Sequence, residues 1–185
     1  SIFKDEVIVT TEDNNIIKSD YVEYNKKKGF LKLKNNIVVK DNQNNIIETD
    51  YAEYYVSDKL FKSKGATKIT TSEEYVIQGE DINFDNKKRF INSKKSSIIK
   101  DKDENKIFLE NFEYQIVDNI FKSIGFVKIK DNMGNVYEFS QIYIDTKKKE
   151  ILGTDIKGFL NQSGLKFNAN NKPRVFANTI KLTEE

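Results

Sequence analysis

The stretch NIIKSDYVEY at residues 15–24 returns as NIIETDYAEY at residues 45–54, an offset of 30 with no residue inserted or lost. Within each stretch the apolar positions lie two residues apart, as Val22 and Tyr24 do on either side of Glu23. Side chains two apart share one face of a β-strand, whereas an amphipathic helix places its apolar residues three and four apart. The repeated stretch therefore predicts a strand with one apolar face.

The offset of 30 residues continues along the chain, which is the signature of a repeat architecture. Apolar columns persist through five copies, for example at residues 9, 39, 69, 99 and 129, at 17, 47, 77, 107 and 137, and at 22, 52, 82, 112 and 142. A slip of one residue would turn every apolar side chain of a strand to the opposite face. The constant count therefore predicts that all copies bury the same side.

Each copy has the pattern of three short strands, at residues 6–11, 16–24 and 30–34 in the first copy, separated by polar turns such as EDNN and NKKKG. We predict an all-β fold in one domain over residues 1–185, built from about five to six such repeats of antiparallel strands. A weaker 60-residue period relates DKLFKSKG at 58–65 to DNIFKSIG at 118–125. It indicates a structure with two walls that alternate copies visit in turn.

Composition argues against several classes of function. The 31 basic and 29 acidic residues are mixed along the chain, without the one-signed face that binding to nucleic acid requires. The chain has no His, Cys or Trp, so it lacks the commonest general base, a thiol nucleophile and most zinc ligands. We interpret the carboxylate pairs Asp20/Glu23 and Asp50/Glu53 as solvated surface residues. We expect no enzyme, no metal site, no cofactor and no nucleic-acid partner.

The apolar columns allow two interpretations. Repeated apolar positions in a β stack form an ordinary core by default, but the same residues would also line a slot for acyl chains. Burial of a methylene group contributes about 0.8 kcal/mol, so a chain of roughly twelve carbons would gain up to about 10 kcal/mol before the cost of ordering it. The lysine-rich turns at 26–28, 87–89 and 147–149 are likewise either solvated loops or contacts for the phosphates of an anionic lipid.

The repeat unit itself resembles a known family. Each copy follows the form V-x-I, a polar turn, S/T-D-Y-x-E-Y, a lysine-bearing turn and L-F-K-S-x-G, which resembles the OstA-like domains of the lipopolysaccharide-transport proteins. The closing stretch at 157–185, with Pro173-Arg174-Val175-Phe176-Ala177, resembles the LptD branch, in which this segment leads to an outer-membrane barrel. The soluble bridge protein LptA and a structural β-repeat module with a sealed core remain the alternatives.

The resemblance implies a twisted, V-shaped β-jellyroll that shelters the acyl chains of lipopolysaccharide, without enzymatic activity. It implies a periplasmic domain, tethered to the outer membrane in the full-length protein, that receives lipid from an LptA-like bridge protein and passes it to a barrel with its lipoprotein partner. The residues expected to form the inner, lipid-binding face are Val39, Ile69, Ile99, Ile129, Ile47, Ile77, Ile107, Ala52, Ile82, Phe112, Tyr54, Phe84, Tyr114, Phe61, Ile91 and Phe121.

The first strand is the expected docking edge for the bridge protein. An open β stack ends in a strand whose outer backbone groups are unpaired, and such an edge is a template for a strand from another chain. The residues predicted to form this edge are Val7, Ile8, Val9 and Thr10.

Overall fold

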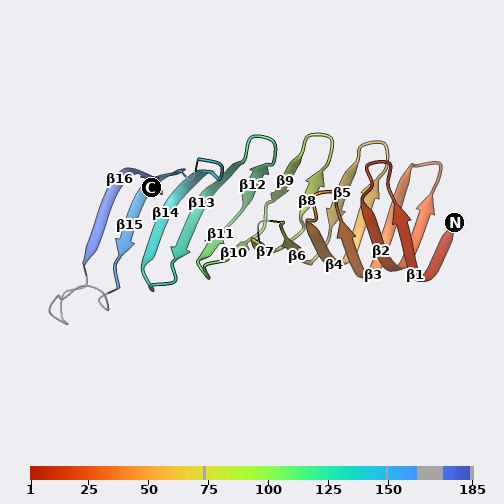
Figure 1. Ribbon diagram of the computed structural model, residues 1–185, viewed down its shortest axis with the longest axis horizontal. Helices are drawn as coiled ribbons and strands as arrows, with labels where there is room; N and C mark the ends of the chain where they lie inside the picture. Colours follow the sequence, from red (N-terminus) through yellow and green to blue (C-terminus); the bar gives the residue numbers. More distant parts are fainter. Residues whose placement is uncertain (73, 149, 162–172, 184–185) are drawn as a thin grey trace. The chain divides into compact units, whose positions relative to one another are not determined.

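The computed structural model describes residues 1–72, 74–148, 150–161 and 173–183. The chain divides into two compact units, Ser1–Lys95 and Ser96–Glu185. The first unit holds β1 (Ile2–Thr10), β2 (Ile16–Asn25), β3 (Phe30–Lys40), β4 (Ile46–Tyr55), β5 (Leu60–Ser63), β6 (Ala66–Thr70), β7 (Val76–Glu80), β8 (Asn83–Asp85) and β9 (Phe90–Ser93) (Figure 1). The second holds β10 (Ser97–Lys100), β11 (Lys106–Leu109), β12 (Phe112–Gln115), β13 (Ile120–Lys130), β14 (Val136–Asp145), β15 (Glu150–Phe159) and β16 (Arg174–Thr183).

The neighbouring strands described for each unit are antiparallel. In the first unit the order is β1-β2-β3-β4-β5-β8-β9, and β4 also pairs with β6, which pairs with β7. In the second unit β13 pairs with β11, β12 and β14, while β15 lies between β14 and β16 and β10 pairs with β11. The prediction of an all-β fold of antiparallel strands is confirmed. No helix in the described residues is long and apolar enough to cross a membrane.

The long strands bend at corners that recur with the repeat. The register shifts between Lys4 and Val7 in β1 and between Lys34 and Ile37 in β3, and the backbone between these positions is left-handed. Left-handed residues recur at 5, 35, 65, 125 and 155, where the sequence has Asp, Asn, Gly, Gly and Asp. These residue types tolerate a positive φ, and a bulge of this kind bends a strand. The chain therefore turns from one wall into the other at fixed positions.

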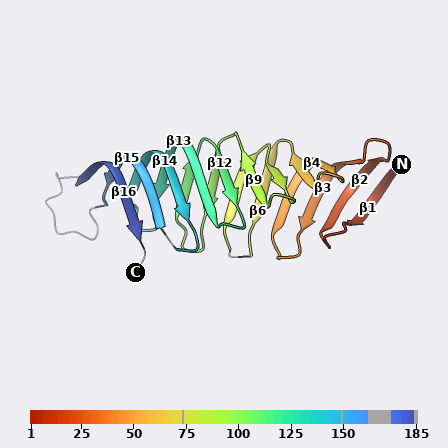
Figure 2. The same cartoon turned by 90° about the horizontal axis from the view of Figure 1, so that it is seen from above.

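Each described copy in the first unit visits both walls. Wall A contains residues 7–10, 16–18, 37–40 and 46–49 with β6 and β7, and wall B contains residues 2–4, 21–25, 30–34 and 51–55 with β5, β8 and β9. β4 demonstrates the division, because its first half pairs with β6 and its second half with β5. The course of β1 to β4 can be followed in Figure 2. The expectation that alternate copies occupy alternate walls was wrong.

The predicted third strand of the first copy was too short for the same reason. Residues 30–34 continue through the corner at Asn35 and Asn36 into residues 37–40, so one strand serves two copies. The corner is a bulge within a strand rather than a loop. Polar residues that tolerate a left-handed backbone occur in both bulges and loops, so the sequence alone does not distinguish the two.

The turns at the far ends of the walls also repeat every 30 residues. Left-handed residues occupy 14, 44, 74, 104 and 134 in the wall A series and 29, 59, 89 and 119 in the wall B series. In the second turn the Asp41 Oδ1 atom accepts hydrogen bonds from the backbone N–H groups of Gln43 and Asn45 at 2.8 and 2.9 Å. The Asn45 Oδ1 atom then accepts from the N–H of Ser72 in the next turn at 3.0 Å. Turn chemistry, as well as the apolar columns, therefore fixes the repeat length.

Small hydroxyl side chains fill the corners between the walls. Ser93 Oγ donates to the carbonyl of Glu80 at 2.7 Å, and Thr49 Oγ1 donates to the carbonyl of Ala66 at 2.9 Å. The Ser63 Oγ atom accepts from the N–H of Ile82 at 2.9 Å. All three hydroxyl residues are buried, and they satisfy backbone groups that the interrupted strand ladders leave free.

Candidate functional site

The apolar columns of both walls meet in one interior in the first unit. Ile17 and Val39 of wall A and Tyr54, Phe61 and Phe84 of wall B line the same small cavity. Within this unit the predicted inner-face residues are all buried, each less than a tenth exposed: Val39, Ile47, Ala52, Tyr54, Phe61, Ile69, Ile77, Ile82, Phe84 and Ile91. The structure therefore places these columns on one shared inner face.

The second unit has the same arrangement with a less closed inner face. Ile99, Phe112 and Phe121 are buried, and the rings of Phe112 and Phe121 stack with centroids 5.8 Å apart. Ile107, Tyr114 and Ile129 are half-buried. These six predicted residues alternate with outward-facing neighbours along their strands, as a two-sided β-wall requires.

The interior of the first unit is packed. The cavity lined by Ile17, Val39, Tyr54, Phe61 and Phe84 has a volume of about 10 Å³, which is the space of about one water molecule. The columns thus form a filled core in this state. An acyl chain would have to part the walls and replace contacts between them with contacts of its own.

Burial also affects the polar end of Tyr54. Desolvation raises the pKa of the Tyr54 hydroxyl above its ordinary value of 10.0, and the negative charge of Asp13 raises it further. Tyr54 and Lys59 line the same cavity, so this tyrosine lies where the apolar interior meets the charged turns.

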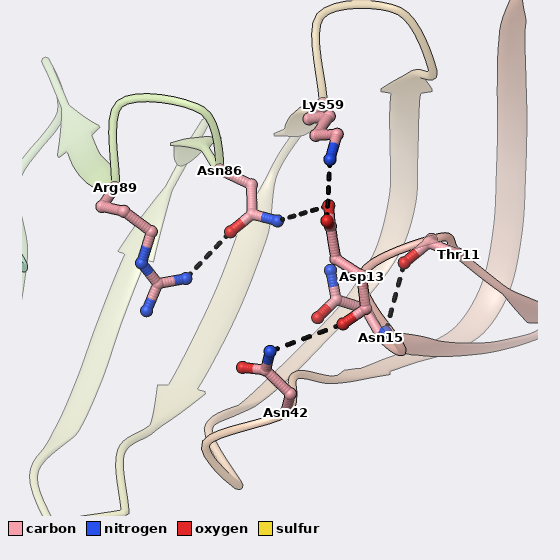
Figure 3. Close-up of polar contacts among 7 residues, drawn as sticks. All are labelled: Thr11, Asp13, Asn15, Asn42, Lys59, Asn86 and Arg89. Atoms are coloured by element: carbon pink, nitrogen blue, oxygen red, sulfur yellow. Dashed lines mark hydrogen bonds and ion pairs between the residues drawn. The ribbon is translucent and has the colours of Figure 1, made fainter.

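A polar cluster closes the interior directly above this cavity. Lys59 Nζ lies 2.7 Å from Asp13 Oδ1, and Asn86 Nδ2 donates to Asp13 Oδ2 at 3.2 Å (Figure 3). Arg89 donates to Asn86 Oδ1 at 2.9 Å and to Gln43 Oε1 at 2.6 Å. Asp13 and Gln43 belong to wall A turns, whereas the other three residues belong to wall B turns. The cluster therefore joins the free ends of the two walls, and we call it the latch.

The two rows of turns that the latch joins carry opposite charge. The wall A turns TEDNN, DNQNN and TSEEY, at 11–15, 41–45 and 71–75, contain acidic residues and no Lys or Arg. The wall B turns KKKG, VSDK and NKKR, at 26–29, 56–59 and 86–89, together contain seven Lys or Arg residues and one Asp. We call them the acidic lip and the basic lip. The hydrogen bond to Asp13 raises the pKa of Lys59 above its ordinary value of 10.5, which favours the charged form in the pair.

Several functional candidates lie elsewhere. A shallow groove of about 480 Å³ crosses the outer side of wall A near the corners, but none of the predicted inner-face residues lines it. In this groove Lys68 Nζ already pairs with Glu48 Oε2 at 2.9 Å. Asp20 accepts from Asn36 Nδ2, and Glu53 accepts from two tyrosine hydroxyls. The described residues contain no group of three or more carboxylates placed to hold a metal ion.

The predicted docking edge lies on β1, at the end of the strand order in the first unit. Thr11 N–H donates to the carbonyl of Asn15 at 3.0 Å, and hydrogen-bonded pairs alternate along an antiparallel ladder. By this alternation Val7 and Val9 bond to β2, whereas Ile8 and Thr10 direct their backbone groups to the open edge. The Ile8 side chain is 62% exposed. Within the described residues no strand pairs with the outer side of β1, so this edge can accept a strand from another protein.

The latch and the corner hydroxyls were not predicted from the sequence. Asp13 and Lys59 are 46 residues apart, and nothing in either turn marks the other as its partner. The corner serines could have been predicted, because Ser63, Ser93 and Ser123 recur at the repeat length of 30 residues. All three are buried in the structure.

Taken together, the two walls, the shared apolar interior and the polar lips define a class of repeat-built β-proteins with a shielded apolar compartment. Residues 6–96, just under half of the chain, match the family of lipopolysaccharide-assembly proteins related to LptC. This range lies almost entirely within the first unit.

Comparison with solved structures gives weaker likenesses. LptH from Pseudomonas aeruginosa, described as the LptA-homologous periplasmic component of the lipopolysaccharide transport device, is 13% identical, with 90% of this chain and 95% of that chain covered and a TM-score of 0.32. The TCP10 domain of Danio rerio CPAP, in complex with a STIL peptide, is 9% identical, with 83% and 88% covered and a TM-score of 0.15. No curated protein sequence matches.

Proposed function

We propose that the chain is a periplasmic, non-enzymatic carrier of lipopolysaccharide that holds the acyl chains between its two walls. The observation that carries this proposal is the convergence of the apolar columns of both walls on one interior in the first unit. The match of residues 6–96 to an LptC-related lipopolysaccharide-assembly family supports the same substrate. The inner-face residues provide an apolar wall without directional chemistry, so lipid chains are distinguished by their length and shape.

The packed interior sets the energetics of loading. Each methylene group transferred from water contributes about 0.8 kcal/mol, but the separation of the walls exposes side chains that are buried against one another in the empty protein. The net affinity is therefore well below the sum over the acyl chain. A carrier that must release its cargo benefits from this balance, because tight binding would prevent transfer.

Within lipopolysaccharide transport, a bridge-type component is better supported than the periplasmic domain of LptD. The matching family is related to LptC. Of the closing segment at 157–185 that resembled LptD, residues 162–172 and 184–185 lie outside the described residues, and Arg174–Thr183 forms β16, paired with β15. The tether to an outer-membrane barrel and the lipoprotein partner belong to the LptD alternative.

Docking to neighbouring proteins of the same pathway is proposed to use the open edge of β1. Its outward backbone groups at Ile8 and Thr10 suit the addition of a strand from an LptA-like bridge protein. The exposed apolar side chains of Ile2, Phe3 and Ile8 lie along this strand and would add contact area to such an interface.

Lipid analysis of the purified protein tests the proposal. We expect mass spectrometry of an organic extract, after expression in the periplasm of a Gram-negative host, to detect lipopolysaccharide at a substantial fraction of one molecule per chain. Because the proposed site is the interior, the extract of a variant with Phe61→Asp should contain much less. A wild-type protein that is folded and free of lipid, and that takes up none when it is added, would instead indicate a structural module with a sealed core.

A further inference from the structure

The two lips meet at the small cavity of the first unit, which Thr11 and Asn15 of the acidic lip line together with Lys59 and Asn86 of the basic lip. The basic lip brings Lys59 and Arg89 to the same cluster. The exposed Lys87 and Lys88 lie in the same turn as Arg89, where Lys88 Nζ pairs with Asp85 Oδ2 at 3.5 Å. Among the described residues of the acidic lip, Asp13 supplies the carboxylate that contacts this cluster. The cluster therefore contains two cationic side chains, Lys59 and Arg89, and one carboxylate, that of Asp13.

The pair at the centre of the latch is accessible to solvent. The side chains of Lys59 and Asp13 are 30% and 31% exposed. An ion pair at this exposure is screened by water and contributes little to stability, so a competing anion can displace the carboxylate at low cost. The amide of Asn86 would donate to the incoming anion as it now donates to Asp13.

We propose that Lys59, Asn86 and Arg89 of the basic lip form a binding site for the phosphate groups of an amphiphile, and that a phosphate replaces Asp13 there as the acyl chains enter the interior. This inference rests on the proposed function. It adds the headgroup chemistry and the point of entry.

The geometry explains how recognition and opening would be coupled. Asp13 holds the end of wall A to wall B through Lys59 and Asn86, and these contacts lie directly over Tyr54, Phe61 and Phe84. A phosphate dianion offers more acceptor oxygens and more charge than one carboxylate, and charge-assisted hydrogen bonds to Lys and Arg are among the stronger ones. Its binding would release the acidic lip, and the released lip would leave space for the attached chains.

The test compares two lipids that share their acyl chains. Binding of phosphorylated lipid A and of the same lipid after enzymatic removal of its phosphates is measured on the full chain, and the ratio of the two affinities is the readout. Lys59→Met removes the central charge and keeps the apolar stem. Lys68→Met is the matched control, because it breaks a comparable ion pair on the outer side of wall A.

We expect wild-type protein to favour the phosphorylated lipid, and Lys59→Met to reduce that preference about tenfold. Lys68→Met should leave the ratio unchanged. Asp13→Asn should increase it, because the competing carboxylate is neutralised while the shape of the side chain is kept. A ratio makes the readout independent of any easier opening of the walls, which affects both lipids alike.

The outcomes separate the two proposals. A ratio of one in the wild type, or a ratio that Lys59→Met does not lower, would overturn the phosphate site and leave the carrier function standing. A folded wild-type protein that binds neither lipid would contradict the carrier function itself. Circular dichroism of each variant confirms that the comparison is made on folded protein.

Discussion

Phe112→Ala is expected to lower the free energy of unfolding by about 3–5 kcal/mol, a large share of the roughly 5–15 kcal/mol that stabilises a typical domain. The Phe112 side chain is fully buried and stacks on Phe121. Its removal leaves a cavity that the surrounding strands cannot close, because their spacing is fixed by the hydrogen-bond ladder. Urea denaturation followed by circular dichroism measures the change.

Phe176→Ala is the control for this prediction. The chemical change is identical, but the Phe176 side chain on β16 is 64% exposed. We expect its free energy of unfolding to stay within about 0.5 kcal/mol of the wild type. Equal losses in the two variants would mean that the inner and outer faces have been assigned wrongly.

Ile8→Pro is expected to weaken binding of an LptA-like bridge protein at least about tenfold and to leave the fold intact. The backbone N–H of Ile8 points to the open edge by the alternation that starts at the bond from Thr11 to Asn15. Proline therefore removes a donor that only an added strand would use. A pull-down with the bridge protein, together with thermal unfolding, measures both effects.

The neighbouring position provides the matched control. Val9 pairs with Ile17 and bonds to β2, so Val9→Pro removes a bond within the protein and should lower its thermal stability. If Ile8→Pro binds the bridge protein as tightly as the wild type, the docking edge must lie elsewhere.

The repeat and its inner face could be predicted from sequence because both depend on period alone. Val22 and Tyr24 lie two residues apart, as do Ala52 and Tyr54, and the two pairs are 30 residues apart, so the pattern is visible without any knowledge of long-range contacts. The same reasoning could not decide between a filled core and an open slot. Both require the same apolar residues on the same face, and only the small volume left between the walls separates them.

Other features depend on how distant segments meet. The polar pair Asn35–Asn36 resembles a turn in sequence, but it forms a corner inside β3 because the neighbouring strands continue on both sides. The latch forms only where the turns of the two walls come together. The pairing of Asp13 with Lys59 therefore depends on the fold and cannot be predicted from either turn alone. The excess of lysine in the wall B turns was visible in sequence, whereas its position opposite an acidic row was not.

Acyl chains are proposed to enter the space between the walls, and adjacent residues of β4 provide a direct test. Tyr54 faces the cavity, whereas the Tyr55 hydroxyl donates to Glu53 on the outer side at 2.7 Å and its ring stacks on Phe30. The photo-reactive p-azidophenylalanine replaces either tyrosine with little change of shape, and the protein is irradiated with lipopolysaccharide bound. We predict a lipopolysaccharide adduct at position 54 and none at position 55. Equal adducts at both positions, or an adduct at position 55 alone, would contradict an interior site.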